Sequence, residues 1–206
     1  MARPRTVSDE DVLAATARAL HRHGPAAATL RTVAAEAGVT AGALVRRFGS
    51  KRDLLLVFAS RAADGVPGAF AAARAAHPSP LAALHVVLAE QVADTDDRDA
   101  LVHGLRFLLL DVTDEEFRAR AAAHAGRVRE GVAGLLADAV RARELRAGTA
   151  AADLARTVHL TANGLLVLWP ITGGGPLREE LRAAVDAVLD PHRPRPRTRT
   201  TTGGDP

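Results

Sequence analysis

The stretch of sequence that decides the fold runs from residue 29 to residue 55 and reads TLRTVAAEAGVTAGALVRRFGSKRDLL. It holds three short apolar runs, and each follows a hydroxyl side chain that can cap a helix, namely Thr29, Thr40 and Ser50. A glycine ends each of the first two runs, where a residue without Cβ can turn the chain. We therefore expect helices over 30–37 and 41–48 and a further helix that begins at residue 51.

Two helices joined by a three-residue turn form a helix-turn-helix pattern, whose second helix can enter the major groove of DNA. The inward positions are apolar or small: Val33, Ala34, Ala37, Val39, Leu44 and Phe48. The outward positions include Arg31, Thr40, Ala41, Gly42, Val45, Arg46 and Arg47. A basic outer face suits phosphate and base-edge contacts, although any helical hairpin with glycine in its turn gives a similar pattern.

The whole chain has the composition of an all-α protein. It holds 45 Ala but only five Phe, one Trp and no Tyr, which is rich in helix formers and poor in strand formers. Ser8 caps a first helix that Gly24 and Pro25 end, and the fourth helix is expected to reach Ala63 and to break over 64–67. Further helices are expected over 67–76, 80–94, 99–112, 114–146, 150–169 and 176–189, and the glycines of the long 114–146 helix are expected to bend or break it.

Charge divides the chain into three parts. Residues 1–63 carry a balance of +5, residues 64–189 carry −4 and residues 190–206 carry +2. Of the 27 basic residues only Lys51 is lysine, so the arginine excess looks like codon bias and only its position is informative. We expect a DNA-binding domain over 1–63, a helical body over 64–189 and a disordered basic tail over 190–206.

The residues that the sequence lacks indicate its compartment and exclude several classes of reaction. Without Cys there are no disulfides, thiolate nucleophiles or Cys-ligated zinc. The N-terminus shows no secretory signal, and the uncharged stretch over 157–177 is a poor membrane span because Pro170 and glycines interrupt it. We expect a cytoplasmic protein without a membrane segment, a metal site or a cofactor.

The quoted stretch resembles the TetR family of transcriptional regulators almost position for position, over about residues 8–61. The resemblance implies an N-terminal three-helix DNA-binding domain and a C-terminal helical domain that binds an effector and dimerises. It further implies a homodimer, usually a repressor, that binds a palindromic double-stranded DNA operator and is released by a small molecule. The effector and the operator stay unknown at this stage, as does the choice between repression and activation.

The family's contact positions carry over residue by residue. Thr40 and Lys51 match positions that touch phosphate, Ala41 and Gly42 face base edges, and Thr29 and Arg31 lie in another contact region. Val45 replaces the family's usual Tyr and could pack on a thymine methyl. Arg47 replaces a common His and is expected to hold phosphate, which leaves Arg46 as the candidate reader of guanine.

The resemblance also implies that the last two helices form a four-helix dimer interface. The expected interface residues are Leu154, Val158, Thr161, Leu165, Leu168, Leu177, Leu181, Val185 and Val188. A second apolar stripe holds Leu160, Gly164 and Val167, so this helix needs two packing surfaces. The alternative is a buried helix in a monomer.

An effector pocket is expected among the middle helices. Its candidate lining is Phe58, Phe70, Leu84, Leu88, His103, Phe107, Phe117, His124, Leu165 and Trp169. Each apolar member can equally be ordinary core and each histidine an ordinary one. With six aromatic residues in the chain, an aromatic cage for a flat cation is not expected, and an aliphatic or mixed pocket is.

Two other classes of function compete with a regulator. An enzyme lacks its motif, because there is no His-Glu-x-x-His, no phosphate-binding glycine loop after a strand, and no metal pair in the divergent His21 and His23. A protein-interaction module with a decayed DNA face is suggested by Val45 alone.

Overall fold

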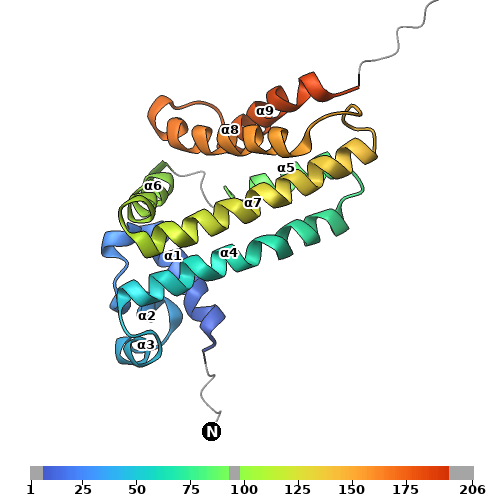
Figure 1. The fold of residues 1–206 in the computed structure, drawn as a ribbon. Coiled ribbons are helices and arrows are strands. Elements are labelled where there is room, and N and C mark those ends of the chain that lie inside the picture. Colours follow the sequence, from blue (N-terminus) through green and yellow to red (C-terminus); the bar gives the residue numbers. More distant parts are fainter. Residues whose placement is uncertain (1–6, 93–97, 195–206) are drawn as a thin grey trace, which may run out of the picture.

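The structure, a computed structural model, describes residues 7–92 and 98–194, and within these ranges it is helical with no strand. Figure 1 shows α1 to α3 at one end and the longer helices stacked beside them. The helices are α1 (Asp9–Ala27), α2 (Leu30–Ala37), α3 (Ala41–Phe48), α4 (Lys51–Ala76), α5 (Pro80–Glu90), α6 (Arg98–Thr113), α7 (Glu115–Arg141), α8 (Ala151–Thr172) and α9 (Leu177–Leu189), followed by the 3-10 turn η1 (Asp190–His192). The expected all-α fold with an N-terminal helix-turn-helix is confirmed.

Helices α1 to α3 and the start of α4 form the headpiece, and its first helix begins where its cap predicts. The Ser8 Oγ accepts a hydrogen bond from the Asp11 N–H at 3.1 Å, and the Asp11 carboxylate accepts one from the Ser8 N–H at 2.9 Å, which is a complete capping box. Gly24 has φ 71° and kinks the end of α1. One core then joins the first four helices through Val12, Val33, Leu44 and Leu54.

The expected break over 64–67 is wrong, because α4 runs unbroken through Pro67. Proline removes one helical hydrogen bond, yet buried side chains lie on both sides of it. Leu54 and Leu55 pack in the headpiece core, whereas Val66 and Phe70 pack in the body core. The proposed domain boundary after residue 63 therefore falls inside a helix that both cores share.

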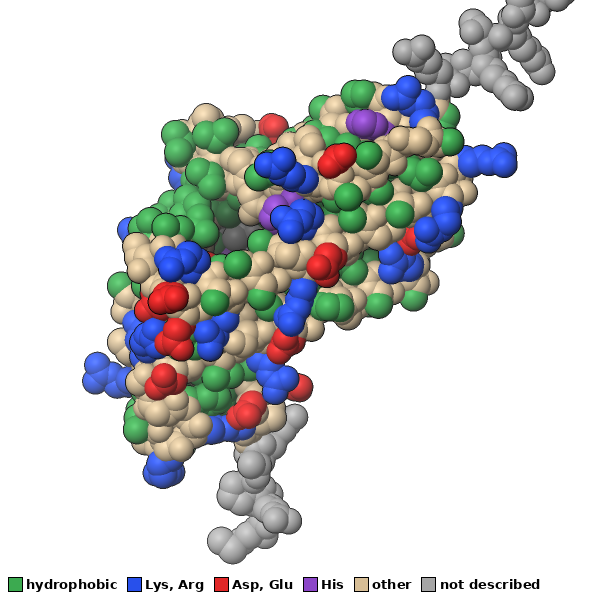
Figure 2. All heavy atoms as spheres, viewed as in Figure 1, with side chains coloured by type: hydrophobic (Ala, Val, Ile, Leu, Met, Phe, Trp, Pro, Cys, Tyr) green, Lys and Arg blue, Asp and Glu red, His purple; other side chains and the backbone are tan. Residues whose placement is uncertain are grey.

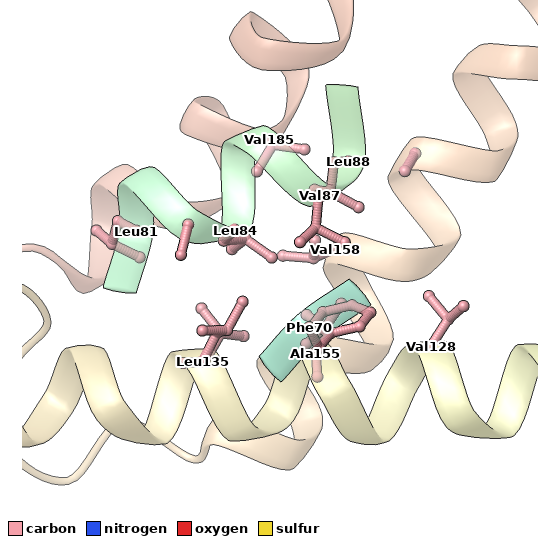
Figure 3. Close-up of a cluster of buried hydrophobic side chains, with 14 of the residues drawn as sticks. Phe70, Leu81, Leu84, Val87, Leu88, Val128, Leu135, Ala155, Val158 and Val185 are labelled. Atoms are coloured by element: carbon pink, nitrogen blue, oxygen red, sulfur yellow. The ribbon is translucent and has the colours of Figure 1, made fainter. Parts of the chain in front are cut away.

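The body, formed by the rest of the described chain, is a layered bundle. Helix α7 packs between α4 on one side and α8 on the other, while α5 contacts α4, α7 and α9. In Figure 3 the side chains of Phe70, Leu84, Leu135, Val158 and Val185 point toward one another, one from each of these five helices. The His85 Nε2 lies 3.2 Å from the Asp186 Oδ1 and joins α5 to α9.

The expected break in the long helix is also wrong, since α7 is continuous over 27 residues despite three glycines. Gly131 serves close approach instead. A Cβ at this position would lie 2.5 Å from the Phe70 Cγ, so only glycine lets α4 and α7 meet here. Helix α8 likewise continues three residues beyond the expected end, through Pro170.

The start of the expected disordered tail is ordered, because η1 covers residues 190–192. The Arg146 N–H donates to the His192 carbonyl at 2.8 Å, and Arg193 pairs with Asp186 at 2.7 Å. Residues 195–206, with Arg195, Arg197 and Arg199, lie outside the described residues. The end of the expected 80–94 helix, residues 93 and 94, also lies outside them.

Within the described residues one helix, α4, is long and apolar enough to cross a membrane by length and composition. A core helix passes the same test, and α4 packs against α1, α3, α5 and α7. Its buried side chains serve the two cores, which accounts for its apolar character.

Gly131→Ala is expected to destabilise the protein by about 1–3 kcal/mol, because the new methyl must displace the buried Phe70 ring. Gly126→Ala is the matched control on the same helix: its added Cβ meets nothing within 4 Å, so helix propensity should stabilise the fold by up to about 1 kcal/mol. Urea unfolding of both variants measures the difference. Equal effects of the two substitutions would contradict the close contact.

Candidate nucleic-acid interface and ligand pocket

The turn between α2 and α3 is fixed by local hydrogen bonds. The Thr29 Oγ1 accepts from the Thr32 N–H at 3.2 Å, and the Thr40 Oγ1 accepts from the Ala43 N–H at 3.1 Å. Gly38 between them adopts φ 70° and ψ 29°, the left-handed conformation that favours glycine. Each short helix therefore begins and ends at a defined residue, and the angle between them is set by the turn.

Helix α3 has one buried side and one exposed side. Leu44 is 1% exposed and anchors α3 in the headpiece core, against Val33 and Ala34 of α2. Val45 is 50% exposed, and Gly42, Arg46 and Arg47 are exposed beside it. Basic side chains stand out from the surface at this end of the molecule (Figure 2).

The nine predicted DNA-contact residues all lie on α2, α3 or the residues that cap and follow them. Thr29, Arg31 and Thr40 are exposed, whereas Ala41 is half-buried and packs against the headpiece core. Among the described residues, Arg31 and Arg46 have no hydrogen-bond or ion-pair partner. These two guanidinium groups are therefore available to an external anion or base edge.

Arg47 and Lys51, in contrast, bond to the two ends of α1. The Arg47 Nη1 donates to the Val7 carbonyl at 2.9 Å, and its Nε pairs with Asp9. The Lys51 Nζ donates to the carbonyls of Pro25 at 2.5 Å and Ala26 at 3.0 Å. Burial lowers the pKa of Lys51. An ammonium has three N–H donors, so one remains for an outside acceptor.

A pocket of about 320 Å³ opens among α4, α6, α7 and α8. Figure 2 shows the surface hollowed in this part of the body, with a histidine at its edge. The lining is Phe58, Ala59, Ala62, Gln91, Phe107, Leu108, Asp111, Arg120, Ala121, His124, Ala125, Val128, His159 and Asn163. It mixes aromatic and aliphatic walls with a few polar groups, as small-molecule sites do.

Three of the ten predicted pocket residues line this cavity: Phe58, Phe107 and His124. Phe70, Leu84 and Leu88 belong to the body core instead, and Leu165 and Trp169 pack against that core. Phe117 is buried in the headpiece core, and the His103 Nδ1 lies 2.8 Å from the His21 carbonyl oxygen. The sequence predicts which residues share a face of a helix. It does not predict which face lines the pocket, because that depends on how the helices cross.

The aromatic residues at the pocket are clustered, within a lining that is mixed as expected. The Phe58 and Phe107 rings meet edge to face with centroids 6.2 Å apart, and Phe107 meets Phe117 in the same way at 6.0 Å. Three of the chain's five phenylalanines thus form one row from the pocket to the headpiece core. Composition gave their number but could not give their clustering.

Asp111 also lines the pocket, although the sequence pattern did not predict it there. Its carboxyl group has no hydrogen-bond or ion-pair partner among the described residues, and burial raises its pKa to about 6. Burial also lowers the pKa values of His124 and His159. One signal was present in the sequence: Asp111 is the only polar residue in the run from Phe107 to Val112.

Most of the predicted dimer residues face inward. Leu154, Val158, Leu177, Leu181 and Val185 are buried in the chain's own core, and Leu165 and Val188 pack against it. Thr161 is half-buried, whereas Leu168 is 54% exposed. The free apolar stripe of α8 is the second one, with Leu160 59% and Ile171 73% exposed beside Val167 and Leu168.

A wider hollow of about 680 Å³ lies where the headpiece meets the body. Pro25, Lys51 and Leu55 line it from the headpiece, and Arg106, Leu110 and Phe117 from the body. Arg52 bridges the same junction, since its Nη2 bonds Asp114 at 2.9 Å and its Nη1 bonds Glu116 at 2.5 Å. Phe117 and these ion pairs join the two parts, together with the packing of α6 against α1 and the continuous helix α4.

Comparison with known proteins agrees with this geometry. Residues 12–57 match the family model described as bacterial regulatory proteins, tetR family. None of the curated proteins compared matches the sequence. The matched range covers most of α1, all of α2 and α3, and the start of α4.

Solved structures share the fold over nearly the whole chain. A TetR transcription regulator from Haloarcula marismortui is 20% identical with a TM-score of 0.72, covering 89% of this chain and 97% of its own. SmeT, the repressor of the Stenotrophomonas maltophilia multidrug efflux pump SmeDEF, is 21% identical with a TM-score of 0.65, covering 97% and 96%. A complex of SmeT with triclosan is 21% identical with a TM-score of 0.68, covering 96% and 97%.

Asp111→Asn is expected to stabilise the protein at pH 8, by about 1 kcal/mol once the partial exposure of the carboxyl group is allowed for. Because the folded-state pKa lies above the ordinary aspartate value of 3.8, ionisation of Asp111 disfavours folding as pH rises from about 4 to 6. The gain should vanish below about pH 4, where both states are protonated. Thermal unfolding at pH 4 and pH 8 measures it, with the exposed Glu130→Gln as control; a gain that is the same at both pH values, or absent at pH 8, would refute the assignment.

Proposed function

We propose that the chain is a TetR-family transcriptional regulator rather than an enzyme, and that it acts as a one-component repressor. It binds a palindromic operator as a homodimer, and a small molecule in the body releases it. The observation that carries this proposal is the capped helix α3, which Leu44 holds in the core and which presents Arg46, unpaired among the described residues, on its outer face. Repression is also the role of SmeT, a repressor with a similar fold.

The proposed DNA-contact residues differ in role according to whether their side chains are already bonded within the protein. Arg46 has no internal partner and reads base edges, because a guanidinium matches the two acceptors of guanine. Val45 and Gly42 lie beside it on the exposed face of α3, where a small apolar surface can meet a thymine methyl. Thr29, Arg31, Thr40 and Ala41 contact the backbone or the groove edge, and Arg47 and Lys51 hold phosphates.

The dimer forms through α8 and α9. Leu160, Val167, Leu168 and Ile171 are large apolar side chains left exposed on α8, and Gly164 lies among them. An apolar stripe on an otherwise packed helix favours burial against a second copy. Two copies related by a two-fold axis present two α3 helices to successive turns of the major groove.

Release of DNA starts at the pocket and reaches the headpiece through α6. Phe107 on α6 touches Phe58 at the pocket and Phe117 in the headpiece core. Helix α6 also packs against α1, so a ligand that displaces α6 displaces the headpiece relative to the body. Such a ligand binds the free protein better than the DNA-bound protein, which is the condition for release.

The place of action is the cytoplasm, where the DNA of a bacterial regulator lies, and the lack of Cys fits a reducing compartment. The headpiece over 1–63 and the body over 64–189 are functional parts but not structurally separate domains, since α4 belongs to both. A protein-interaction module would keep the fold without the DNA contacts.

Duplexes selected from a random library are expected to yield a footprint of two half-sites about 34 Å apart, with an affinity that falls steeply with salt. Arg46→Ala should cost about 1–3 kcal/mol and relax the base preference at one position of each half-site. Arg31→Ala, Arg47→Ala and Lys51→Ala should weaken binding to all sequences alike.

Arg129→Ala, on an exposed position of α7, is the control for loss of one positive charge and should leave binding unchanged. Selection of no preferred sequence would overturn the regulator assignment in favour of the interaction module. An unchanged base preference in the Arg46 variant would remove only the base-reading role.

Leu168→Arg is expected to convert the dimer to a monomer, because the substitution places a charge in the centre of the apolar stripe. Light scattering coupled to size exclusion measures the mass. Ala72→Arg, on an exposed position of α4, adds the same charge elsewhere and should leave the dimer intact. A Leu168 variant that stays dimeric would exclude this stripe as the interface.

A further inference from the structure

Asp111 is a charged group placed where a partner is missing. It lies on α6 after three leucines, half-buried in the pocket wall. Among the described residues no donor or cation meets its carboxylate. A partly desolvated carboxylate without a hydrogen-bond partner is unfavourable, and such a group in a cavity points to a ligand that supplies the missing charge.

The aromatic walls of the pocket also favour a positively charged ligand. The Phe58 and Phe107 rings both line the cavity, and their edge-to-face contact at 6.2 Å and 82° keeps the two ring planes at different angles. The face of a benzene ring attracts a cation by its quadrupole. A cation held by Asp111 would therefore meet carboxylate and ring surface in one small space.

The other titratable groups that line the cavity do not supply the missing charge. Burial lowers the pKa values of His124 on α7 and His159 on α8 below the usual value for histidine, so both are neutral at pH 7. Arg120 on α7 lines the cavity as well, but its Nε donates to the Ser60 Oγ at 3.0 Å and its Nη1 to the Glu116 carbonyl at 2.9 Å. These bonds hold two of the Arg120 N–H groups on neutral acceptors, and among the described residues no hydrogen bond or ion pair joins Arg120 to Asp111. The Asp111 carboxylate is therefore left for a cationic ligand.

We infer that the pocket takes an effector with one protonated amine or similar nitrogen cation on a compact apolar body, with Asp111 as its counter-ion. This inference rests on the proposed function, because it names the chemical class of the effector. The volume of about 320 Å³ lies at the low end for ligand sites. It suits a body of one ring and a short chain, with Asn163 and Gln91 as further polar neighbours at the wall.

Three probes with the same body separate charge from shape: 3-phenylpropylamine, 3-phenylpropan-1-ol and 3-phenylpropanoic acid. Calorimetric titration of the DNA-free protein at pH 7.5 should show that the amine binds at least about tenfold more tightly than the alcohol, because one charge-assisted hydrogen bond contributes at least this much to the affinity. The acid should not bind. In Asp111→Asn the amine should bind no better than the alcohol. Glu130→Gln should keep the wild-type preference.

The pH dependence provides a second readout. The preference for the amine should fade between pH 7.5 and pH 5, because Asp111 takes up a proton near pH 6 while the amine stays charged. Protonation of His124 and His159 acts in the same direction, so the Asp111→Asn variant measures their share. Loss of most of the pH dependence in this variant supports the counter-ion role.

The inference is overturned by three results: no binding of the amine, equal binding of amine and alcohol, or a preference that survives in Asp111→Asn. All three are measured without DNA, so they are independent of the operator footprint that tests the regulator itself. Binding of the amine with the expected preference but without release of the operator would leave the site intact and refute the release step.

Discussion

Helix α4 buries one part of its length in each of the two hydrophobic cores, and the rest of the structure depends on this shared burial. Leu54 and Leu55 close the headpiece core, and Val66 and Phe70 fill the body core. The apolar contacts on both sides offset the hydrogen bond that Pro67 removes. Because the helix is continuous between the cores, movement of its body end is also movement of the headpiece, and no separate linker is needed.

The contact that completes this coupling is apolar rather than ionic. Arg52 pairs with Asp114 and Glu116, but these groups are partly exposed, and such pairs contribute about 0–1 kcal/mol each. Phe117 is 3% exposed in the headpiece core although it belongs to α7. Burial of an aromatic ring contributes several times more, about 3 kcal/mol or above. The hollow beside it leaves room for the ring contacts to shift.

Local signals predicted the headpiece well. Prediction of the body was limited, because its structure depends on packing between residues far apart in the sequence. Helices α2 and α3 have the predicted bounds because Thr29, Gly38 and Thr40 fix their ends by contacts within a few residues. Pro67 and Gly131 misled because their effects depend on partners in other helices. Helix α8 is apolar on several faces, so periodicity alone could not say which face is core. Asp111 shows the same limit, since its lack of a partner is a tertiary property.

Two cations of the headpiece, both proposed DNA contacts, are linked to the candidate pocket through α1. Arg47 bonds Val7 and Asp9 at the start of α1, and Lys51 bonds Pro25 and Ala26 at its end. A phosphate that recruits either cation therefore acts on α1. Since α1 packs against α6, and Phe107 and Asp111 of α6 line the pocket, the proposed DNA contacts and the proposed effector site bear on the same helix pair. Linkage is reciprocal, so an effector that displaces α6 weakens DNA binding by the factor by which DNA weakens effector binding.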